Sequence, residues 1–305
     1  MRRTGIVGIG DMGSGLAKNL LAAGFACTGH DLKEDRLRAF ADAGGRAAHG
    51  AAEVASHADA VFVMVMDGNE AKSVILGPDG LAAHLAPGST VLLTATIKPA
   101  EAREIGEAMA GSGVHLVDSP VSGGYPGAQN GTLTMMAAGD PAVLDEVRPV
   151  MEAVSSSIHR VGTRAGDGQT VKACLQALIG GLFSATFEAA VLAAKSGVPG
   201  DVLREVVASS SAGCAIANGA LEHIVERRFE GTGSGIRTMH KDLTISLDLA
   251  ESLGVPMHVA SAAMQLFHAG RARYPDGDNQ AVARVIEEIV GAELHRGAPV
   301  ARGRP

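Results

Sequence analysis

Three glycines near the N-terminus have a spacing that suits phosphate binding. The segment GIVGIGDMGSGLAKNL holds Gly8, Gly10 and Gly13 in the pattern G-x-G-x-x-G, between a β-prone run and a helical pattern. In this pattern the glycines permit a tight turn, close approach of a pyrophosphate, and close packing of helix on strand. The free N–H groups of the helix N-terminus then attract the anion. We predict a dinucleotide site here, with Asp11 and Met12 among its contacts.

An acidic residue, Asp31, follows about 20 residues after the glycines, at the end of the second expected strand. A carboxylate there accepts hydrogen bonds from ribose hydroxyls and repels a 2′-phosphate, which favours NAD over NADP. Lys33 and Arg36 nearby could still tolerate a phosphate. The alternative is that Asp31 only caps the following helix, but its position and type favour the cofactor role. We also predict a cofactor contact at Met66.

Lys172 and Gln176 lie four residues apart near the start of a long helical pattern, so both can reach one small molecule. Hydride removal from a C–OH group needs a partner for the hydroxyl proton. A lysine whose charged form is disfavoured by burial and by a helix N-terminus suits that role. A lone helical lysine is ordinarily just solvated. Here four apolar neighbours favour burial: Val171, Cys174, Leu175 and Leu178.

Ser122, Gly123 and Gly124 form a second turn of small residues. A hydroxyl beside two residues without Cβ lets backbone N–H groups converge on an anion. The turn follows an expected strand end, which is where doubly wound sheets bind ligands. The simpler alternative is a plain turn, for which Pro120 and the glycine pair suffice.

The elements that must position these residues alternate between β-prone and helix-period segments up to about Ala138, which indicates βαβ units in a parallel-rich sheet. The expected strands are Thr4 to Ile9, Ala26 to His30, Ala60 to Met66, Thr90 to Thr94, His115 to Asp118 and Leu133 to Ala138. The expected helices between them are Gly13 to Ala23, Glu34 to Ala43, Asn69 to Leu76, Pro99 to Gly111 and Pro141 to Ala153.

After Gly162 the strand signals disappear. The helices expected there are Gln169 to Ser196, Pro199 to Ser209, Ala215 to Glu226, Met239 to Leu253, His258 to Ala269 and Gln280 to Gly291. We therefore predict an α/β Rossmann-like domain over residues 1–164 and an all-α domain over 165–296, joined by the long helix. Residues 297–305 are expected to be a disordered tail.

Composition excludes several classes of protein. The net charge is −7 without a long basic run, which argues against nucleic acid and anionic membranes as partners. The most apolar windows, such as Asp59 to Met66 and Ala189 to Ala194, fall short of the roughly 18 residues of a membrane span. The arginine-led N-terminus lacks a cleavage site, which argues against a signal peptide. No histidine or cysteine spacing indicates a metal.

The three cysteines, Cys27, Cys174 and Cys214, are odd in number and far apart. This spacing fits neither a disulfide framework nor a zinc site, so a cytoplasmic protein is expected. Each cysteine is interpreted as a small buried hydrophobic residue.

The chain resembles the β-hydroxyacid dehydrogenase family, which includes 3-hydroxyisobutyrate, tartronate semialdehyde and threonate dehydrogenases. The likeness lies in four segments that occur in the family's order and cover nearly the whole chain: GIVGIGDMGSGLAKNL, DSPVSGGYPGAQNGTLTMMAAGD, GDGQTVKACLQ and MHKDL. The resemblance implies a Rossmann-like domain joined by a long helix to a helical domain, as the pattern above also predicts. It also implies association through the helical domain, and thus a homo-oligomer.

By matching positions, the resemblance implies that Ser122, Gly123 and Gly124 hold the substrate carboxylate and that Lys172 moves the proton. It places Thr96 near the nicotinamide, and Lys241 at the cofactor with Asp242 as its neighbour. For Thr96 and Lys241 the alternatives are a helix-capping hydroxyl and an exposed charge pair.

The chain departs from the family at three positions: Ala95 replaces a serine, Asp67 replaces a proline, and Gln176 replaces an asparagine. The longer amide of Gln176 implies a different substrate pocket. Gln at this position is similar to the threonate branch and points to a polyhydroxylated acid, but SSSAGCAIANGA lacks the aromatic residue of that branch.

The expected activity is NAD-dependent oxidation of a small 3-hydroxy acid, or reduction of the matching semialdehyde, with Lys172 as general acid and base. Two alternatives remain open. One is a dinucleotide sensor or scaffold without turnover, which would need neither Lys172 nor the PVSGG loop. The other is an imine-reducing relative, in which the lysine is typically replaced.

Overall fold

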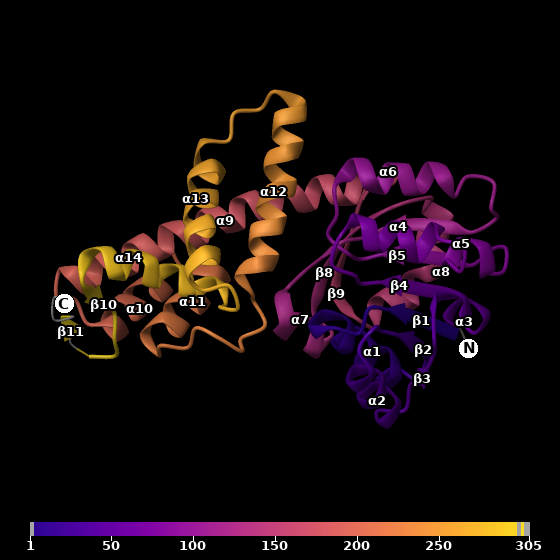
Figure 1. The fold of residues 1–305 in the computed structure, drawn as a ribbon, viewed down its shortest axis with the longest axis horizontal. Coiled ribbons are helices and arrows are strands. Elements are labelled where there is room, and N and C mark those ends of the chain that lie inside the picture. The colour runs from indigo at the N-terminus through magenta and orange to yellow at the C-terminus, as the bar shows by residue number, and fades with distance from the viewer. Residues whose placement is uncertain (1–2, 298–299, 302–305) are drawn as a thin grey trace. The chain divides into compact units, whose positions relative to one another are not determined.

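The computed structural model describes residues 3–297 and 300–301. The chain divides into two compact units, residues 1–172 and residues 173–305. Helix α9 (Asp167–Lys195) begins in the first unit and continues in the second. Figure 1 shows the first unit as a sheet with helices on both faces and the second as helices with one short hairpin. We describe each unit separately.

The sheet of the first unit has nine strands among the described residues, in the order β3-β2-β1-β4-β5-β6-β8-β7, with β9 also pairing with β8. Neighbours from β3 to β6 are parallel, β8 runs antiparallel to β6 and β7, and β9 is parallel to β8. The chain leaves β1 toward β2 on one side and returns to β4 on the other. Such a reversal of strand order opens a crevice at the carboxyl ends of the strands.

The strands are β1 (Arg3–Val7), β2 (Ala26–His30), β3 (Arg46–Ala47), β4 (Ala60–Val63), β5 (Thr90–Leu93), β6 (His115–Asp118), β7 (Val121–Ser122), β8 (Leu133–Ala138) and β9 (Ser155–Gly162). The helices of this unit before α9 are α1 (Asp11–Ala22), α2 (Glu34–Asp42), α3 (Ala51–Ser56), α4 (Gly68–Leu76), α5 (Leu81–His84), α6 (Pro99–Ala108), α7 (Gly124–Asn130) and α8 (Pro141–Glu152).

Apolar residues alternate along the strands and fill a core on each face of the sheet. Ile6 and Phe62 face Leu16 of α1 and Val147 of α8. On the other face, Val61 and its strand neighbours meet the core residues of α3 to α6, which are Val54, Ile75, Leu81 and Ile105. Side chains of successive strand residues point to opposite faces, so each strand supplies both cores.

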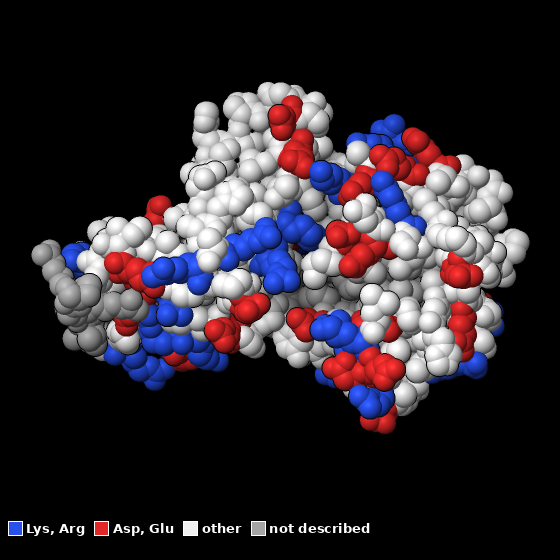
Figure 2. Space-filling view, viewed as in Figure 1, with Lys and Arg blue, Asp and Glu red and all other residues white. Residues whose placement is uncertain are grey.

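The second unit consists of helices with one small hairpin. Besides α9 it contains α10 (Gly200–Ser209), α11 (Ala215–Val225), α12 (Ile236–Leu253), α13 (His258–Arg273), the 3₁₀ turn η1 (Asn279–Ala281), α14 (Val282–Val290), β10 (Ala292–Glu293) and β11 (Val300–Ala301). Its core is organised around Phe183, Phe187 and Phe267, whose ring centroids lie 5.7 to 6.5 Å apart. At the α12–α13 turn, Leu253, Val255 and Val259 are exposed, and Figure 2 shows a mostly white surface with acidic side chains beside it on α12.

The parallel-rich sheet, the Rossmann-like first half and the helical second half confirm the predicted fold class. Every expected strand and helix is present, most of them with shifted ends. The missed elements are mostly short ones, β3, β7, α3, α5, α7, β10 and β11, together with the eight-residue β9. The strand β10 lies within the segment 165–296, so the prediction that this segment is entirely helical is wrong there. In the predicted tail, Val300–Ala301 pairs with β10, and residues 298–299 and 302–305 lie outside the described residues.

Helix α9 is long and apolar enough to cross a bilayer by length and composition alone, so the prediction that every apolar window falls short of a membrane span is wrong. However, 56% of its most apolar window is buried inside the protein. A core helix of a protein passes the same test of length and hydropathy, and Phe183, Phe187 and Ala190 of α9 belong to the core of the second unit.

The cysteines differ in their surroundings. Cys27 is buried, as predicted, and burial raises the pKa of its thiol to about 11. The prediction of burial is wrong for Cys174, which is exposed, and for Cys214, which is half-buried. Cys174 lies on the outer face of α9, and Cys214 caps α11 by accepting from the N–H of Ala217. All three thiols are free.

Candidate active site

The glycine-rich turn joins β1 to α1 and depends on the absence of side chains. Gly8 has a φ of +91°, and a Cβ there would lie 2.3 Å from the carbonyl oxygen of Met64. A Cβ on Gly13 would lie 1.9 Å from the carbonyl oxygen of Gly8. The turn and the packing of α1 on its strand therefore both require glycine, as the sequence predicts.

The first turn of α1 fits a dinucleotide phosphate. The helix begins at Asp11 with Gly10 as its N-cap residue, and no side chain caps it. The guanidinium of Arg36 lies beside Gly10. If Gly10 carried a Cβ, the nearest atom to it would be Nη1 of Arg36, at 3.4 Å. The turn thus presents backbone N–H groups beside a guanidinium, and both attract an anion.

Asp31 is 7% exposed and faces this turn. Its Oδ2 accepts from the backbone N–H of Ile9 at 2.7 Å, and its Oδ1 accepts from that of Lys33 at 2.9 Å. Arg36 forms an ion pair with the same carboxylate at 3.4 Å. The alternative of a helix cap is wrong, because the N-cap of α2 is Lys33 and no side chain caps it.

Thr96 and Met66 follow β5 and β4, whose carboxyl ends lie at the same edge of the sheet as that of β1. Thr96 is half-buried and is not a helix cap, since Lys98 holds that position at α6. Met66 is 50% exposed. Asp67, the departure from the family's proline, caps α4 by accepting from the N–H of Glu70 at 3.0 Å.

The small-residue loop is more than a plain turn. Ser122 ends β7 and pairs with β8, while Gly123 is the N-cap of α7. Gly123 and Gly124 have φ values of +130° and +58°, which favour glycine at both positions. The loop begins shortly after β6, so it lies at the same edge of the sheet as the glycine-rich turn and Thr96.

Lys172 lies in the second turn of α9 and is only 6% exposed. It belongs to a buried polar stripe at helical spacing, formed with Gln169 and Gln176. The sequence-based prediction attributes the burial of Lys172 to its apolar neighbours, and this reason is wrong. Three of these neighbours form the outer face of the helix, because Val171, Cys174 and Leu178 are exposed. The first turns of α9 therefore bury a lysine and two glutamines beside Ala173 and Ala177, whereas these polar residue types are ordinarily exposed.

In the second unit, a buried carboxylate joins Gln176 and Lys241. Asp242 is 3% exposed, and its Oδ2 accepts from Nε2 of Gln176 at 2.5 Å. Its Oδ1 lies 2.9 Å from the ammonium of Lys241. An exposed pair of Lys241 and Asp242 is therefore excluded, and Asp242 fixes the orientation of the Gln176 amide because a carboxylate only accepts.

Two buried residues of the first unit were not predicted as functional. Asp118 ends β6 and Gln169 lies in the first turn of α9, both with no exposed surface. Burial raises the pKa of Asp118 to about 6, although hydrogen bonds from Gln169 and Gly166 oppose the shift. The signal was present in the sequence: an aspartate four residues before the small-residue loop and a glutamine three residues before Lys172.

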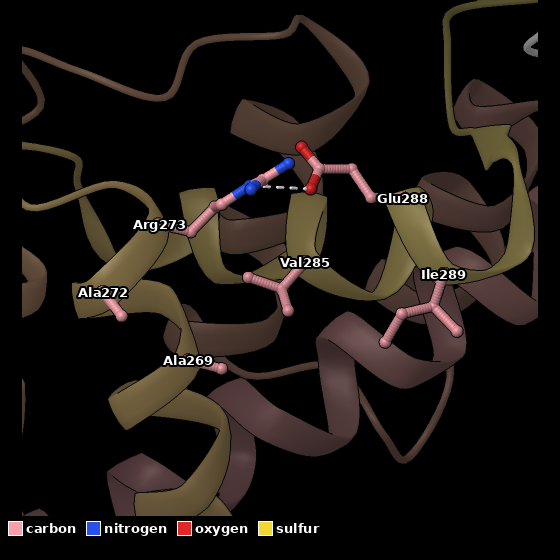
Figure 3. Close-up of a pocket in the computed structure, with 6 residues that line it drawn as sticks. All are labelled: Ala269, Ala272, Arg273, Val285, Glu288 and Ile289. Atoms are coloured by element: carbon pink, nitrogen blue, oxygen red, sulfur yellow. Dashed lines mark hydrogen bonds and ion pairs between the residues drawn. The ribbon is translucent and has the colours of Figure 1, made fainter. Parts of the chain in front are cut away.

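A separate depression lies on the second unit, between α13 and α14 (Figure 3). It has a volume of about 510 Å³ and is lined by Ala269, Ala272, Arg273, Val285, Glu288 and Ile289. Arg273 and Glu288 form an ion pair of 3.1 Å across its rim. None of the predicted site residues lines this depression.

Two family models together match most of the chain. Residues 3–162 match the family described as the NAD binding domain of 6-phosphogluconate dehydrogenase. Residues 166–286 match the family described as the NAD-binding domain of NADP-dependent 3-hydroxyisobutyrate dehydrogenase.

Individual relatives span nearly the full length. An L-threonate dehydrogenase of Escherichia coli is 36% identical over 93% of this chain and 95% of its own. An NAD-dependent L-serine dehydrogenase of Pseudomonas aeruginosa is 33% identical over 95% of this chain and 100% of its own. The crystal structure of a 3-hydroxyisobutyrate dehydrogenase from Salmonella typhimurium matches with a TM-score of 0.87 and 34% identity, over 93% of this chain and 100% of that one.

The fold, the glycine-rich turn and these matches define an NAD-linked oxidoreductase that acts on a CH–OH group. The chain belongs to the β-hydroxyacid dehydrogenase family, which confirms the resemblance seen in its four sequence segments.

Proposed function

We propose that this chain oxidises a small polyhydroxylated acid with NAD, and that Lys172 receives the proton of the reacting hydroxyl. The observation that carries the proposal is the burial of Lys172 on the polar stripe of α9. A lysine taken out of water near a helix N-terminus suits proton transfer better than a solvated one. NAD, when bound, accepts the hydride.

Each remaining site residue has a part in binding. Gly8, Gly10, Asp11, Met12 and Gly13 would hold the pyrophosphate at α1. The ribose would meet Asp31, while Met66, Thr96 and Lys241 would contact the rest of the cofactor. Ser122, Gly123 and Gly124 would hold the substrate carboxylate, and Gln176 would orient a substrate hydroxyl. Lys172 takes the hydroxyl proton during oxidation and returns it during reduction.

We propose L-threonate as the first substrate to test, with L-serine and 3-hydroxyisobutyrate as competitors. Relatives that carry these substrate names match the chain over most of its length. Gln176, held by Asp242, supports a hydroxylated acid because its amide is fixed for hydrogen bonding and does not turn freely.

The test is NADH formation by the wild type and by a Lys172→Ala variant across this panel. We expect kcat to fall by about 10²- to 10⁴-fold in the variant, the range for loss of a general base, while the Kd for NADH stays unchanged. Lys195→Ala is the matched control. Lys195 lies on the same helix but is exposed and bonds only the carbonyl of Val290 among the described contacts.

An equal rate for folded Lys172→Ala and wild type would contradict the role of Lys172. Binding of NADH by the wild type without turnover of any hydroxy acid would favour a dinucleotide sensor. Reduction of a cyclic imine by the wild type, in the absence of hydroxy-acid turnover, would favour the imine-reducing alternative.

We further propose that the protein acts in the cytoplasm as a homo-oligomer formed through its helical unit. The three free cysteines support a reducing compartment. Large apolar side chains exposed on the second unit support self-association, among them Leu192 at 69%, Val259 at 70% and Ile289 at 78% exposure. Light scattering at several concentrations measures the oligomeric state.

A further inference from the structure

Asp118 and Gln169 are joined by hydrogen bonds inside the first unit. Oδ1 of Asp118 accepts from Nε2 of Gln169 at 2.9 Å. Oδ2 accepts from the backbone N–H groups of Gln169, at 3.2 Å, and of Gly166, at 2.8 Å. The carboxylate thus occupies the N-terminal end of α9, where free N–H groups and the helix dipole stabilise a negative charge.

The other hydrogen bonds of the Gln169 amide reach both sides of Thr96. Nε2 donates to the carbonyl of Ala95 at 3.0 Å, and Oε1 accepts from the N–H of Ile97 at 3.1 Å. Both donor hydrogens of the amide and its oxygen are therefore used. A single side chain fixes the backbone before and after Thr96, which the proposed function places at the cofactor.

The same contact brings α9 against the strand that leads to the small-residue loop. A Cβ on Gly168 would lie 2.8 Å from the carbonyl oxygen of Asp118 and 2.6 Å from that of Met136. Glycine at this position lets α9 begin directly against β6 and β8. Lys172 follows one turn later on the same face of the helix as Gln169.

We propose that Asp118 and Gln169 are positioning residues for the oxidation: together they fix the α9 turn that carries Lys172 relative to the Thr96 loop. This inference rests on the proposed function. Three groups that the reaction needs, namely Lys172, Thr96 and the Ser122–Gly124 loop, come from different segments of the chain. The pair is bonded to two of these segments directly, and Asp118 ends the strand β6 four residues before the third.

A purely architectural role would be served better by apolar side chains. Burial of a carboxylate without a cationic hydrogen-bond partner is unfavourable, as the raised pKa of Asp118 shows. An apolar pair of the same volume would also attach α9 to the sheet, but it could not set the directions of the Ala95 carbonyl and the Ile97 N–H. Fully satisfied buried polar networks specify a geometry in this way.

The test compares Gln169→Met and Gln169→Glu with the wild type. Methionine keeps the length of the side chain and removes its hydrogen bonds. We expect Gln169→Met to lower kcat on the preferred hydroxy acid by about 10- to 100-fold, the scale of an ångström-size misplacement, while the Kd for NADH changes little. Gln280→Met is the matched control. Gln280 is also buried and donates to the Arg228 carbonyl and to Thr232, in the second unit.

Gln169→Glu separates positioning from folding through its pH profile. An ionised carboxylate in place of the Gln169 amide would face the Asp118 carboxylate and the Ala95 carbonyl, whereas a protonated carboxyl could donate to one of them. The other charged groups nearby are Arg103 of α6, against Gly166, and Asp167 and Lys172 of α9. We expect the ratio of variant kcat to wild-type kcat to rise as pH falls from about 8 to about 6, with both proteins folded by circular dichroism at each pH.

The outcomes are distinguishable from failure of the proposed function. Absence of turnover by the wild type would refute the proposed function itself. If the wild type turns over but folded Gln169→Met keeps wild-type kcat, or the kcat ratio of Gln169→Glu is the same at every pH, the positioning role is refuted. If Gln169→Met does not fold, the profile of Gln169→Glu decides.

Discussion

Two buried aspartates end parallel strands of the same sheet, Asp31 after β2 and Asp118 at the end of β6, yet their surroundings differ. Asp31 bonds two backbone N–H groups and has Arg36 as a partner at 3.4 Å. The hydrogen-bond donors of Asp118 are neutral amides of Gly166, Gly168 and Gln169. A carboxylate beside a half-buried arginine can exchange partners with a ligand, whereas one enclosed by the protein's own amides holds segments of the chain together.

The largest difference that we expect between Asp118 and Asp31 is in how much each contributes to the free energy of unfolding. Asp118→Ala would leave two backbone N–H groups and the Gln169 amide without their acceptor in a closed interior, and we expect it to lower the free energy of unfolding by about 3 to 5 kcal/mol. Asp31→Ala loses two acceptor contacts near solvent, so about 1 to 2 kcal/mol is expected. Urea denaturation followed by circular dichroism measures both.

NADH binding supplies the control for this stability comparison. Folded Asp118→Ala should bind NADH with nearly the wild-type Kd, whereas Asp31→Ala should bind it more weakly. Equal losses of stability in the two variants would mean that the difference in their hydrogen-bond partners has no energetic consequence.

A smaller effect concerns the pH dependence of stability. The pKa of Asp118 is about 6 in the folded protein and 3.8 as the ordinary value. The folded state therefore binds the proton more tightly, and the stability linked to this group is fully present below about pH 4 and is lost as pH rises through 6. Integrated over the shift, the loss is about 3 kcal/mol.

The difference in unfolding free energy between the wild type and Asp118→Asn isolates this titration, because the other ionisable groups cancel. We expect the wild type's advantage over Asp118→Asn to shrink by up to about 3 kcal/mol between about pH 4 and pH 7. Urea denaturation at a series of pH values checks it. An advantage that is constant or grows with pH would show that Asp118 titrates as an ordinary carboxyl.

The same comparison explains what the sequence can and cannot predict. Asp31 is recognisable because its role follows from a fixed distance to the glycines within one βαβ unit. The role of Asp118 depends on its pairing with Gln169, which is 51 residues away in the chain. No local pattern encodes such a pair. For the same reason the link from Gln176 to Asp242, 66 residues away, was not predicted, although both residues were named.

Periodicity also has a physical limit at α9. The apolar positions Val171, Cys174 and Leu178 indicate a buried face by the ordinary rule, but they are exposed, and the polar stripe is buried. The rule assumes that burial is driven by apolar area alone. It fails where the buried side chains are held by specific hydrogen bonds, as Gln169 and Gln176 are.

The smallest effect concerns the choice between NAD and NADP at Asp31. The Arg36 guanidinium lies over Gly10 and is paired with Asp31, so removal of the carboxylate would leave a cation where a 2′-phosphate needs one. The preference for NAD is measured as the ratio of kcat/KM with NAD to kcat/KM with NADP. We expect Asp31→Ser to lower this ratio by about 10- to 100-fold, which corresponds to about 1.4 to 2.7 kcal/mol.

Two further variants show whether Arg36 is the cause. Asp31→Ser combined with Arg36→Ala should lose the gain toward NADP, because no guanidinium remains to meet the phosphate. Asp35→Ser is the matched control, since Asp35 is exposed on α2 and should leave the ratio as in the wild type. An unchanged ratio in Asp31→Ser would place cofactor discrimination elsewhere. In that case Asp31, like Asp118, would serve mainly to join segments of the chain, through its bonds to Ile9 and Lys33.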